Sequence, residues 1–456
     1  MTTARRGRAA AVTAGLLGLT LAAAGCGTGG STDDGGSADG GAAPSLAPGC
    51  EEFADYSGAS GPVSIYSSIR DEEADRYTRA FADFEECTGI DVQWEGTGEF
   101  EAQLQVRVQG GNAPDLATIP QPGLLQRLVA SGDVVEPSEL TAQHAEEFYP
   151  EEMRDYGSVD GTLYAVSNST NVKSFVWYSP TMFTERGYTV PTTWDEMLAL
   201  SDRMAADGIK PWCAGVASGD ATGWPATDWL EDVVLRDAGT EVYDQWVNHE
   251  IPFDDPQVAE ALDRVGGILK NEEYVNGGFG GVDSIVATTF QDGGLPILQG
   301  QCGLHRQASF YANNWPEGTT IAEDGDVFAF YLPATDNPDE QPVLGGAEFV
   351  AAFTDRPEVQ AVQAYMASPD YVNRRAREGS FISSNSELDP ANVGDPIQLL
   401  SLETLRDPAA VFRFDGSDQM PAAVGSGTFW RAMVDWLNGG DTQQVLTTVE
   451  DSWPAS

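Results

Sequence analysis

An aromatic residue and an acidic residue close together in this sequence could bind a ligand jointly. Trp224 lies in the run 222–229, where Gly223 and Pro225 indicate a loop, an unusual place for a core tryptophan. Such a ring can stack on the apolar face of a ligand, and the nearby Asp228 can accept two hydrogen bonds from hydroxyl groups. The pair favours binding of a hydroxyl-rich molecule. The competing interpretations are core packing for Trp224 and a plain helix-start charge for Asp228.

Motifs for catalysis and for metal binding are missing from the sequence. It has no GxSxG, no HExxH and no phosphate-binding glycine loop, and His144, His249 and His305 are scattered without ligand spacing. Carboxylates are abundant, and glycoside hydrolases use a pair of them, but abundance alone does not indicate such a pair. We therefore expect a binding protein rather than an enzyme, without a cofactor and without a metal.

The charge balance narrows the classes of partner. The chain has 71 acidic and 24 basic residues in 456, a formal net charge of −47. A polyanion such as nucleic acid needs clustered cations, so this balance excludes nucleic acid as a partner and leaves neutral ligands open. The length exceeds a single comfortable core, which predicts at least two lobes.

The start of the chain has the pattern of an exported lipoprotein. Residues 1–26 combine a basic beginning, an apolar stretch over 9–24 and Cys26 after small residues, which resembles a lipobox with Cys26 as the lipidated position. Residues 27–49 are rich in Gly, Ser, Asp and Ala without apolar periodicity, which is typical of a flexible tether.

The remaining cysteines form an even set. Cys50, Cys87, Cys213 and Cys302 allow three pairings in an oxidising compartment. Proximity in the chain favours Cys50 with Cys87, and therefore Cys213 with Cys302.

The first part of the expected globular chain alternates strands and helices. Strands are expected over 63–66, 90–94 and 115–119, with helices over 72–84 and 101–109 between them. Such alternation implies a parallel sheet whose ligand-facing loops lie at the carboxyl ends of the strands. Candidate ligand-binding residues in those loops are Ser67, Ser68, Arg70, Glu99 and Gln121.

The later part of the chain contains further elements. A strand is expected over 175–178, and a helix over 195–206 whose N-cap is Thr193. Other expected elements are helices over 229–236, 257–270, 358–367 and 429–437 and a strand over 346–353.

Two runs, Phe175–Gly187 and Pro191–Met197, strongly resemble the signature of family 1 extracellular solute-binding proteins, which include maltose- and α-glucoside-binding proteins. Other pieces fall in family order, and the resemblance spans about 62–436. These pieces are Ala113–Leu116, Gly345–Phe349, Gly379–Ser384, and Met420-Pro421 followed by Phe429-Trp430.

The resemblance implies a two-lobed α/β clamshell of the type II periplasmic-binding-protein class, with the ligand in the cleft between the lobes. Segment order then assigns 50–171 plus 330–380 to the N-terminal lobe. The C-terminal lobe takes 172–329 plus 381–456.

Position in the family pattern adds candidate ligand-binding residues from the hinge, the cleft wall and the end of the chain. Glu348 is notable because a carboxylate between apolar strand residues is costly unless it is paired or liganded. The full set added in this way is Lys173, Trp177, Arg306, Phe310, Gly346, Glu348 and Trp430.

The resemblance implies that the protein captures a di- or oligosaccharide, an α-glucoside above all, for an ABC import system. Its partners would be the sugar and membrane permease subunits, and it would act as a monomer, lipid-anchored at the extracellular face of the membrane. A sugar-sensing or adhesin-type binding protein on the same fold is an alternative, as is a glycoside hydrolase. The sequence does not distinguish trehalose, maltose, sucrose or a longer sugar.

Overall fold

The computed structural model describes residues 51–56, 61–333 and 341–454. The expected signal peptide (1–26), the lipidated Cys26, the tether (27–49) and Cys50 lie outside these residues. Within them, none of the helices has both the length and the apolar character that crossing a membrane requires.

The expected parallel strands form the start of the first sheet. β1 (Pro62–Ser67) lies between β2 (Asp91–Gly96) and β3 (Leu116–Ile119) and runs parallel to both. The single helix expected over 72–84 is instead two helices, α1 (Asp71–Ala80) and α2 (Ala82–Thr88). The helix tightens at the junction, where the N–H of Phe81 bonds to the carbonyl of Thr78 at 3.2 Å, and Tyr77, Phe81 and Phe84 are all buried in one core.

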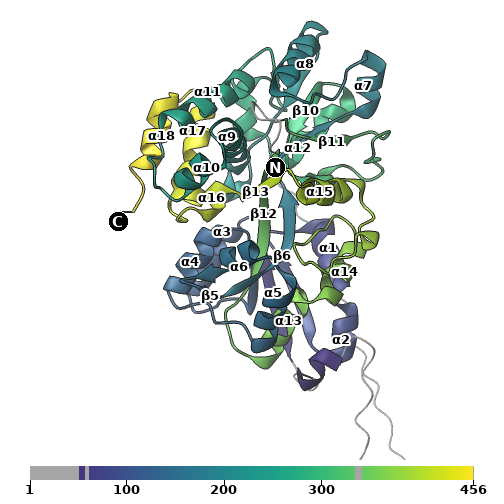
Figure 1. Ribbon diagram of the computed structural model, residues 1–456, viewed down its shortest axis with the longest axis vertical. Coiled ribbons are helices and arrows are strands. Elements are labelled where there is room, and N and C mark those ends of the chain that lie inside the picture. Colours follow the sequence, from purple (N-terminus) through teal and green to yellow (C-terminus); the bar gives the residue numbers. More distant parts are fainter. Residues whose placement is uncertain (1–50, 57–60, 334–340, 455–456) are drawn as a thin grey trace, which may run out of the picture. The chain divides into compact units, whose positions relative to one another are not determined.

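A long strand completes this sheet and leaves it. β12 (Gln341–Ala352) pairs antiparallel with β3 and with β6 (Ala165–Val172), and parallel with β13 (Ala410–Phe414). Leu344, in the first half of β12, packs in the core of the second sheet, whereas Phe349 packs in a core of the first. β12 thus passes from one core to the other, beside β6 (Figure 1).

The second sheet has the strand order β11-β7-β10-β8-β9. β10 pairs antiparallel with β7 and parallel with β8. The strands are β7 (Phe175–Tyr178), β8 (Lys210–Cys213), β9 (Val275–Asn276), β10 (Cys302–Arg306) and β11 (Phe328–Tyr331).

Helices cover both sheets (Figure 1). Around the first sheet lie α3 (Phe100–Gln109), α4 (Pro122–Ala130), α5 (Glu139–Phe148), α6 (Glu151–Tyr156), α13 (Pro357–Ala367) and α14 (Pro369–Arg377). The other helices are α7 (Pro180–Arg186), α8 (Trp194–Ala206), α9 (Trp224–Asp237), α10 (Thr240–Val247), α11 (Pro256–Leu269), α12 (Phe290–Gly293), α15 (Pro396–Arg406), α16 (Gly416–Gln419), α17 (Trp430–Leu437) and α18 (Thr442–Glu450). The predicted cap of α8 is confirmed, since Thr193 Oγ1 accepts from the N–H of Glu196 at 3.2 Å.

The expected lobe boundaries stay a prediction, and the sheet pairing suggests one change to them. Residues 381–456 were assigned to the C-terminal lobe, but β13 belongs to the first sheet and Phe381, Ile382 and Leu388 pack in a core of that sheet. We propose that the chain crosses for the last time between Phe414 and Gly416.

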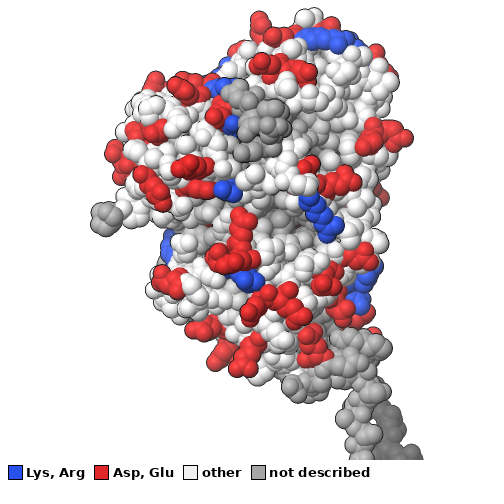
Figure 2. All heavy atoms as spheres, in the orientation of Figure 1, with Lys and Arg blue, Asp and Glu red and all other residues white. Residues whose placement is uncertain are grey.

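Acidic side chains are spread over the surface. On the face shown in Figure 2, Asp and Glu far outnumber Lys and Arg, in keeping with the net charge of −47. This distribution is that of a solvated acidic protein.

The predicted disulfide between Cys213 and Cys302 is confirmed, with a Cα–Cα separation of 5.6 Å. It joins β8 to its neighbour β10 and closes a sequence separation of 89 residues. The pairing of Cys50 with Cys87 stays a prediction.

We expect the double variant C213A/C302A to lose about 3 kcal/mol of unfolding free energy, because the crosslink restricts the unfolded chain over a long loop. Urea denaturation followed by circular dichroism measures the change, with unchanged native spectra as the control. An unaltered midpoint would show that the bond adds no stability.

Candidate functional site

A cavity of about 940 Å³ is lined by residues that follow strands of both sheets. The first sheet contributes Ser68–Glu73, Thr97–Glu101, Pro120 and Gln121, which are loops and helix starts at the carboxyl ends of β1, β2 and β3. These are the strand ends at which the sequence predicted a ligand. The opposite wall comes from Ala217–Gly219, Trp224, Thr289–Asp292, Ser309 and Phe310.

The wall on the side of the first sheet carries four buried oxygen atoms without a hydrogen-bond partner among the described residues. They are Gln121 Oε1, Thr170 Oγ1, Asn171 Oδ1 and Glu348 Oε2. The amide of Gln121 is held by its own Nε2, which donates to Glu101 Oε1 at 3.0 Å. An unpaired buried polar atom costs about 1–3 kcal/mol. Four of them in one cavity wall therefore indicate a ligand that supplies hydrogen-bond donors.

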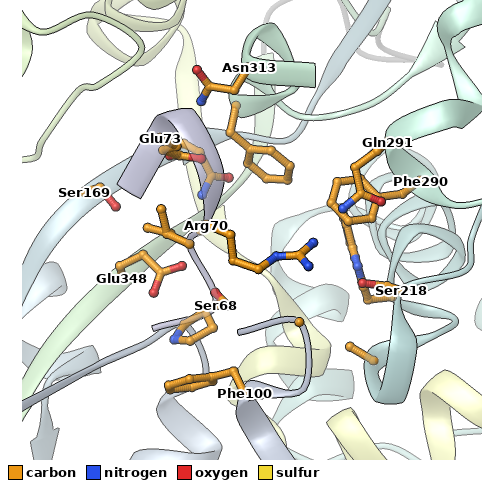
Figure 3. A pocket seen from close by; sticks show the side chains of 18 of the residues that line it. Ser68, Arg70, Glu73, Phe100, Ser169, Ser218, Phe290, Gln291, Asn313 and Glu348 are labelled. Atoms are coloured by element: carbon orange, nitrogen blue, oxygen red, sulfur yellow. The ribbon is translucent and has the colours of Figure 1, made fainter. Parts of the chain in front are cut away.

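The opposite wall presents three half-buried aromatic rings. The ring centroids of Trp224 and Phe290 are 5.0 Å apart, and Phe310 lies 6.0 Å from Trp224 and 6.4 Å from Phe290. In Figure 3, Glu348 and Ser169 lie on one side of the cavity and Phe290 and Gln291 on the other, with the Arg70 side chain extending between them. The unpaired oxygens thus gather on one wall, and the cluster of three aromatic rings lies on the other.

A buried ionic cluster lies beneath the cavity. The ammonium of Lys173 contacts Asp415 and lies 3.1 Å from Asp228 Oδ1 and 3.9 Å from Asp418 Oδ2. Arg306 bonds Asp232 Oδ2 at 2.7 Å and Asp228 Oδ2 at 3.3 Å. Five buried carboxyl groups thus share three buried cations. The carboxyl groups belong to Asp228, Glu231, Asp232, Asp415 and Asp418, and the cations to Lys173, Arg236 and Arg306.

The excess of carboxyl groups separates their pKa values. Burial opposes ionisation of Asp415, but the ammonium of Lys173 and hydrogen bonds from Lys173 and the backbone of Asp418 lower its pKa to about 2. Burial raises the pKa of Asp228 to about 7 despite Lys173. Burial and the neighbouring Asp415 raise the pKa values of Glu231 and Asp418 well above the ordinary range. The cluster therefore holds protons as well as cations.

The same carboxyl groups have the composition of a cation site. Oxygen atoms of Asp228, Glu231 and Asp415 lie within 4.8 Å of one another. Lys173 contacts two of these three groups, so its ammonium already supplies the positive charge that a metal ion would bring.

Ten of the residues predicted from the sequence line the cavity, and whether they contact a ligand stays a prediction. They are Ser68, Arg70, Glu99, Gln121, Lys173, Trp224, Phe310, Gly346, Glu348 and Trp430. The reason given for Trp224 was wrong, however, because it is the first residue of α9 and not part of a loop. Gly223 precedes it at φ +115°, and a Cβ there would lie 2.2 Å from the carbonyl oxygen of Trp430.

Four predicted residues lie outside the lining, because the protein uses their polar atoms internally. Ser67 accepts from Thr118 Oγ1 at 2.7 Å, and the indole of Trp177 donates to the carbonyl of Gln307 at 3.0 Å within the second core. Asp228 and Arg306, the latter inside β10 and not after it, belong to the ionic cluster. These side chains support the walls from behind.

Sequence reasoning missed Thr170, Asn171, Phe290, Asp415 and Asp418, which all line the cavity. A signal existed for the first two, since the run Ser167–Asn171 is polar throughout although it lies in a mostly buried strand. The other three offered none, because single residues in polar segments acquire a role only when the chain folds.

Comparison with known proteins places the chain in a family. The family described as bacterial extracellular solute-binding protein matches residues 70–372. The chain belongs to this family. Two relatives of this solute-binding protein are the osmoprotective compounds-binding protein GgtB of Synechocystis (42% identical over 400 residues, 86% of this chain and 92% of the relative) and the alpha-glucosides-binding periplasmic protein AglE of Rhizobium meliloti (37% over 402 residues, 86% of each).

Solved structures of solute-binding proteins share the fold at low sequence identity. The solute receptor AcbH has a TM-score of 0.72 at 19% identity and covers 86% of this chain and 98% of its own. RafE in complex with raffinose has a TM-score of 0.67 at 17% identity, with 86% and 98% covered. The expected two-lobed α/β clamshell is confirmed as the fold of this solute-binding protein.

We expect pH to act on stability through Asp228. A group whose pKa is raised by folding stabilises the protein below its unfolded pKa, near 3.9, and loses that contribution as the pH rises through its folded pKa of about 7. Relative to the variant D228N, the wild type should therefore lose about 2 kcal/mol between pH 5 and pH 8.

Urea denaturation of both proteins at several pH values measures this difference. The comparison removes the contributions of other groups, such as His305, whose pKa burial lowers to about 4. Parallel stability profiles for the two proteins would contradict the assignment.

Proposed function

We propose that this protein is the extracellular carbohydrate-binding component of an ABC import system. It captures a di- or oligosaccharide with an α-glucosidic linkage in the cavity between its lobes and delivers the sugar to membrane permease subunits. It binds the sugar without altering it and acts as a monomer.

The two-sided cavity is the observation that carries this proposal. A sugar ring has hydroxyl groups around its edge and C–H groups on its faces. Hydroxyl groups of a sugar can donate to the four unpaired oxygens, which belong to Gln121, Thr170, Asn171 and Glu348. The C–H faces of its rings can stack on the aromatic rings of Trp224 and its neighbours. A cavity of about 940 Å³ has room for more than one sugar ring.

The names of several relatives point in the same direction. AglE is named for α-glucosides, and a more distant relative from Streptomyces coelicolor for diacetylchitobiose. GgtB is named for osmoprotective compounds. We place an α-glucoside first among ligands because AglE, which is named for α-glucosides, is 37% identical over 86% of this chain.

Closure of the lobes gives the binding mechanism. Neither the aromatic wall nor the polar wall encloses a sugar alone, so the ligand binds the closed state more tightly and shifts the population toward it. The closed form is then the one that the permease receives. We further propose that Cys26, which lies outside the described residues, carries the lipid that anchors the protein to the membrane.

Isothermal titration with maltose, trehalose, sucrose and maltotriose tests the proposal, with product analysis of the same mixtures. We expect binding heat and no hydrolysis. Product formation would indicate a glycoside hydrolase, and the absence of heat with every sugar would refute sugar capture.

We expect W224A to weaken sugar binding about 30-fold, or about 2 kcal/mol, because a central aromatic ring carries a large share of binding energy in a cavity of this kind. Titration of the variant measures the loss. F279A is the matched control, since Phe279 is 81% exposed and does not line the cavity. Equal affinities of W224A and wild type would remove Trp224 from the site.

We expect T170V to separate binding from stability. The hydroxyl of Thr170 is unpaired and buried, so the apolar variant should keep or gain stability while sugar affinity falls about fivefold. Titration and thermal unfolding give the two quantities. A loss of stability with no change in affinity would mean that the hydroxyl serves the fold and not the ligand.

A further inference from the structure

Two polar contacts join the walls at the edge of the cavity. The N–H of Ala102 in α3 donates to Asp220 Oδ2 at 3.1 Å, and Arg76 Nη1 in α1 donates to Asn313 Oδ1 at 3.3 Å. Asp220 belongs to η2 (Gly219–Ala221), a short turn after β8 of the second sheet. Neither Ala102 nor Asp220 lines the cavity, so the first contact joins the walls outside the surface that a ligand meets.

The contact with Asp220 completes a helix that lacks its own cap. Ala102 is the third residue of α3, and its N–H is one that an N-cap side chain normally bonds. Glu99 occupies the N-cap position of α3 and makes no such bond. In α8, by contrast, the N-cap residue Thr193 makes this bond, with the N–H of Glu196 three residues later. For α3 the acceptor comes from Asp220, 118 residues away and on the other wall.

The backbones around this contact approach closely. Gly219 has φ +60°, and a Cβ at this position would lie 3.0 Å from the carbonyl oxygen of Gly98, in the loop before α3. Ser218, the residue before this turn, and Asn313 lie at separate parts of the cavity (Figure 3). The contacts of Asp220 and Asn313 therefore join the walls at separate places.

The charge of Asp220 has two opposite effects on its contact with α3. A carboxylate at the start of a helix is stabilised by the helix dipole. The same carboxylate adds to burial in raising the pKa of Glu101, the neighbour of Ala102 in α3. The bond can form only while the two walls are close, so its free energy is available only in the closed state.

We propose that Asp220 caps helix α3 across the cavity and thereby sets the affinity of this protein for its ligand without touching the ligand. The ligand readout of this inference rests on the proposed function. Because the cap exists only in the closed state, its loss removes the free energy of one N-cap from that state. The closed state is then less populated, and the apparent affinity for the ligand falls. The bound sugar also leaves faster, because opening no longer requires breaking the cap.

The variant D220A tests the role of Asp220 as a positioning residue. For the sugars maltose, trehalose and sucrose, we expect the Kd of the variant to rise about fivefold, mostly because the sugar dissociates faster. Stopped-flow measurement of tryptophan fluorescence gives the dissociation rate. Thermal unfolding should be unchanged, because Asp220 is exposed and lies in a surface turn. D220N keeps an acceptor oxygen but no charge and should lie between D220A and wild type. D283A is the control, because Asp283 is an exposed acid in another short turn, η3 (Val282–Ala287), and does not line the cavity.

If the wild type binds one of these sugars, the inference is overturned when D220A keeps the Kd and the dissociation rate of the wild type.

If the wild type binds none of the sugars, the proposed function has failed, and small-angle scattering of the ligand-free proteins tests the cap by itself. A cap between the walls should make the wild type more compact than D220A. Identical scattering curves would reject the cap, and a smaller radius of gyration for the wild type would support it.

Discussion

The ion pairs of Lys173 fix the place where the two halves of the chain join. Lys173 follows β6, its N–H donates to the carbonyl of Leu344 in β12 at 2.7 Å, and its ammonium bonds Asp415 just after β13. The N–H of Asp415 donates in turn to the carbonyl of Gly345 at 2.8 Å. The backbone and the side chain of Lys173 together thus tie three crossing segments, and Asp228 connects them to α9. Burial would lower the pKa of this ammonium, but the surrounding carboxylates raise it well above its ordinary value. A charge removed from such a cluster leaves its partners unpaired in a low-dielectric site, which is strongly destabilising.

The cluster also explains which side chains of the cavity are available to a ligand. Lys173, Asp415 and Asp418 line the cavity and satisfy one another there, and the walls add unpaired acceptors and aromatic rings. A neutral, hydroxyl-rich ligand fits these walls because it supplies donors without bringing a charge that needs compensation. In the proposed closure, the crossing strands act as the hinge and a small number of wall contacts bias the closed state.

Much of the fold was predictable because local rules and tertiary packing agree. Short runs rich in β-branched and aromatic residues gave β1 and β7 within one residue at each end, and the Thr193 cap gave the start of α8. The division at Phe81 and the helical start at Trp224 were not predictable. In the first case a local change of backbone hydrogen bonding divides the helix while the amphipathic pattern continues across it. In the second case a helix begins beside the close backbone approach of Gly223 to Trp430, where Gly and Pro indicated a loop.

The sequence by itself determined the family and the alternation that places loops at the carboxyl ends of parallel strands, since each depends on a recognisable run or on residues close in the chain. Chain proximity favoured the pairing of Cys213 with Cys302, but these residues are 89 apart, and only the folded sheet brings them together. Tertiary structure alone decided which polar groups face the cavity. Asp228 and Arg306 have the chemistry of ligand-binding residues, yet they satisfy each other below the floor, whereas Thr170 and Asn171 inside a strand are left without partners. The physical reason is that hydrogen-bond satisfaction is a property of the whole folded neighbourhood. A donor or acceptor becomes available to a ligand only when no other part of the chain reaches it first.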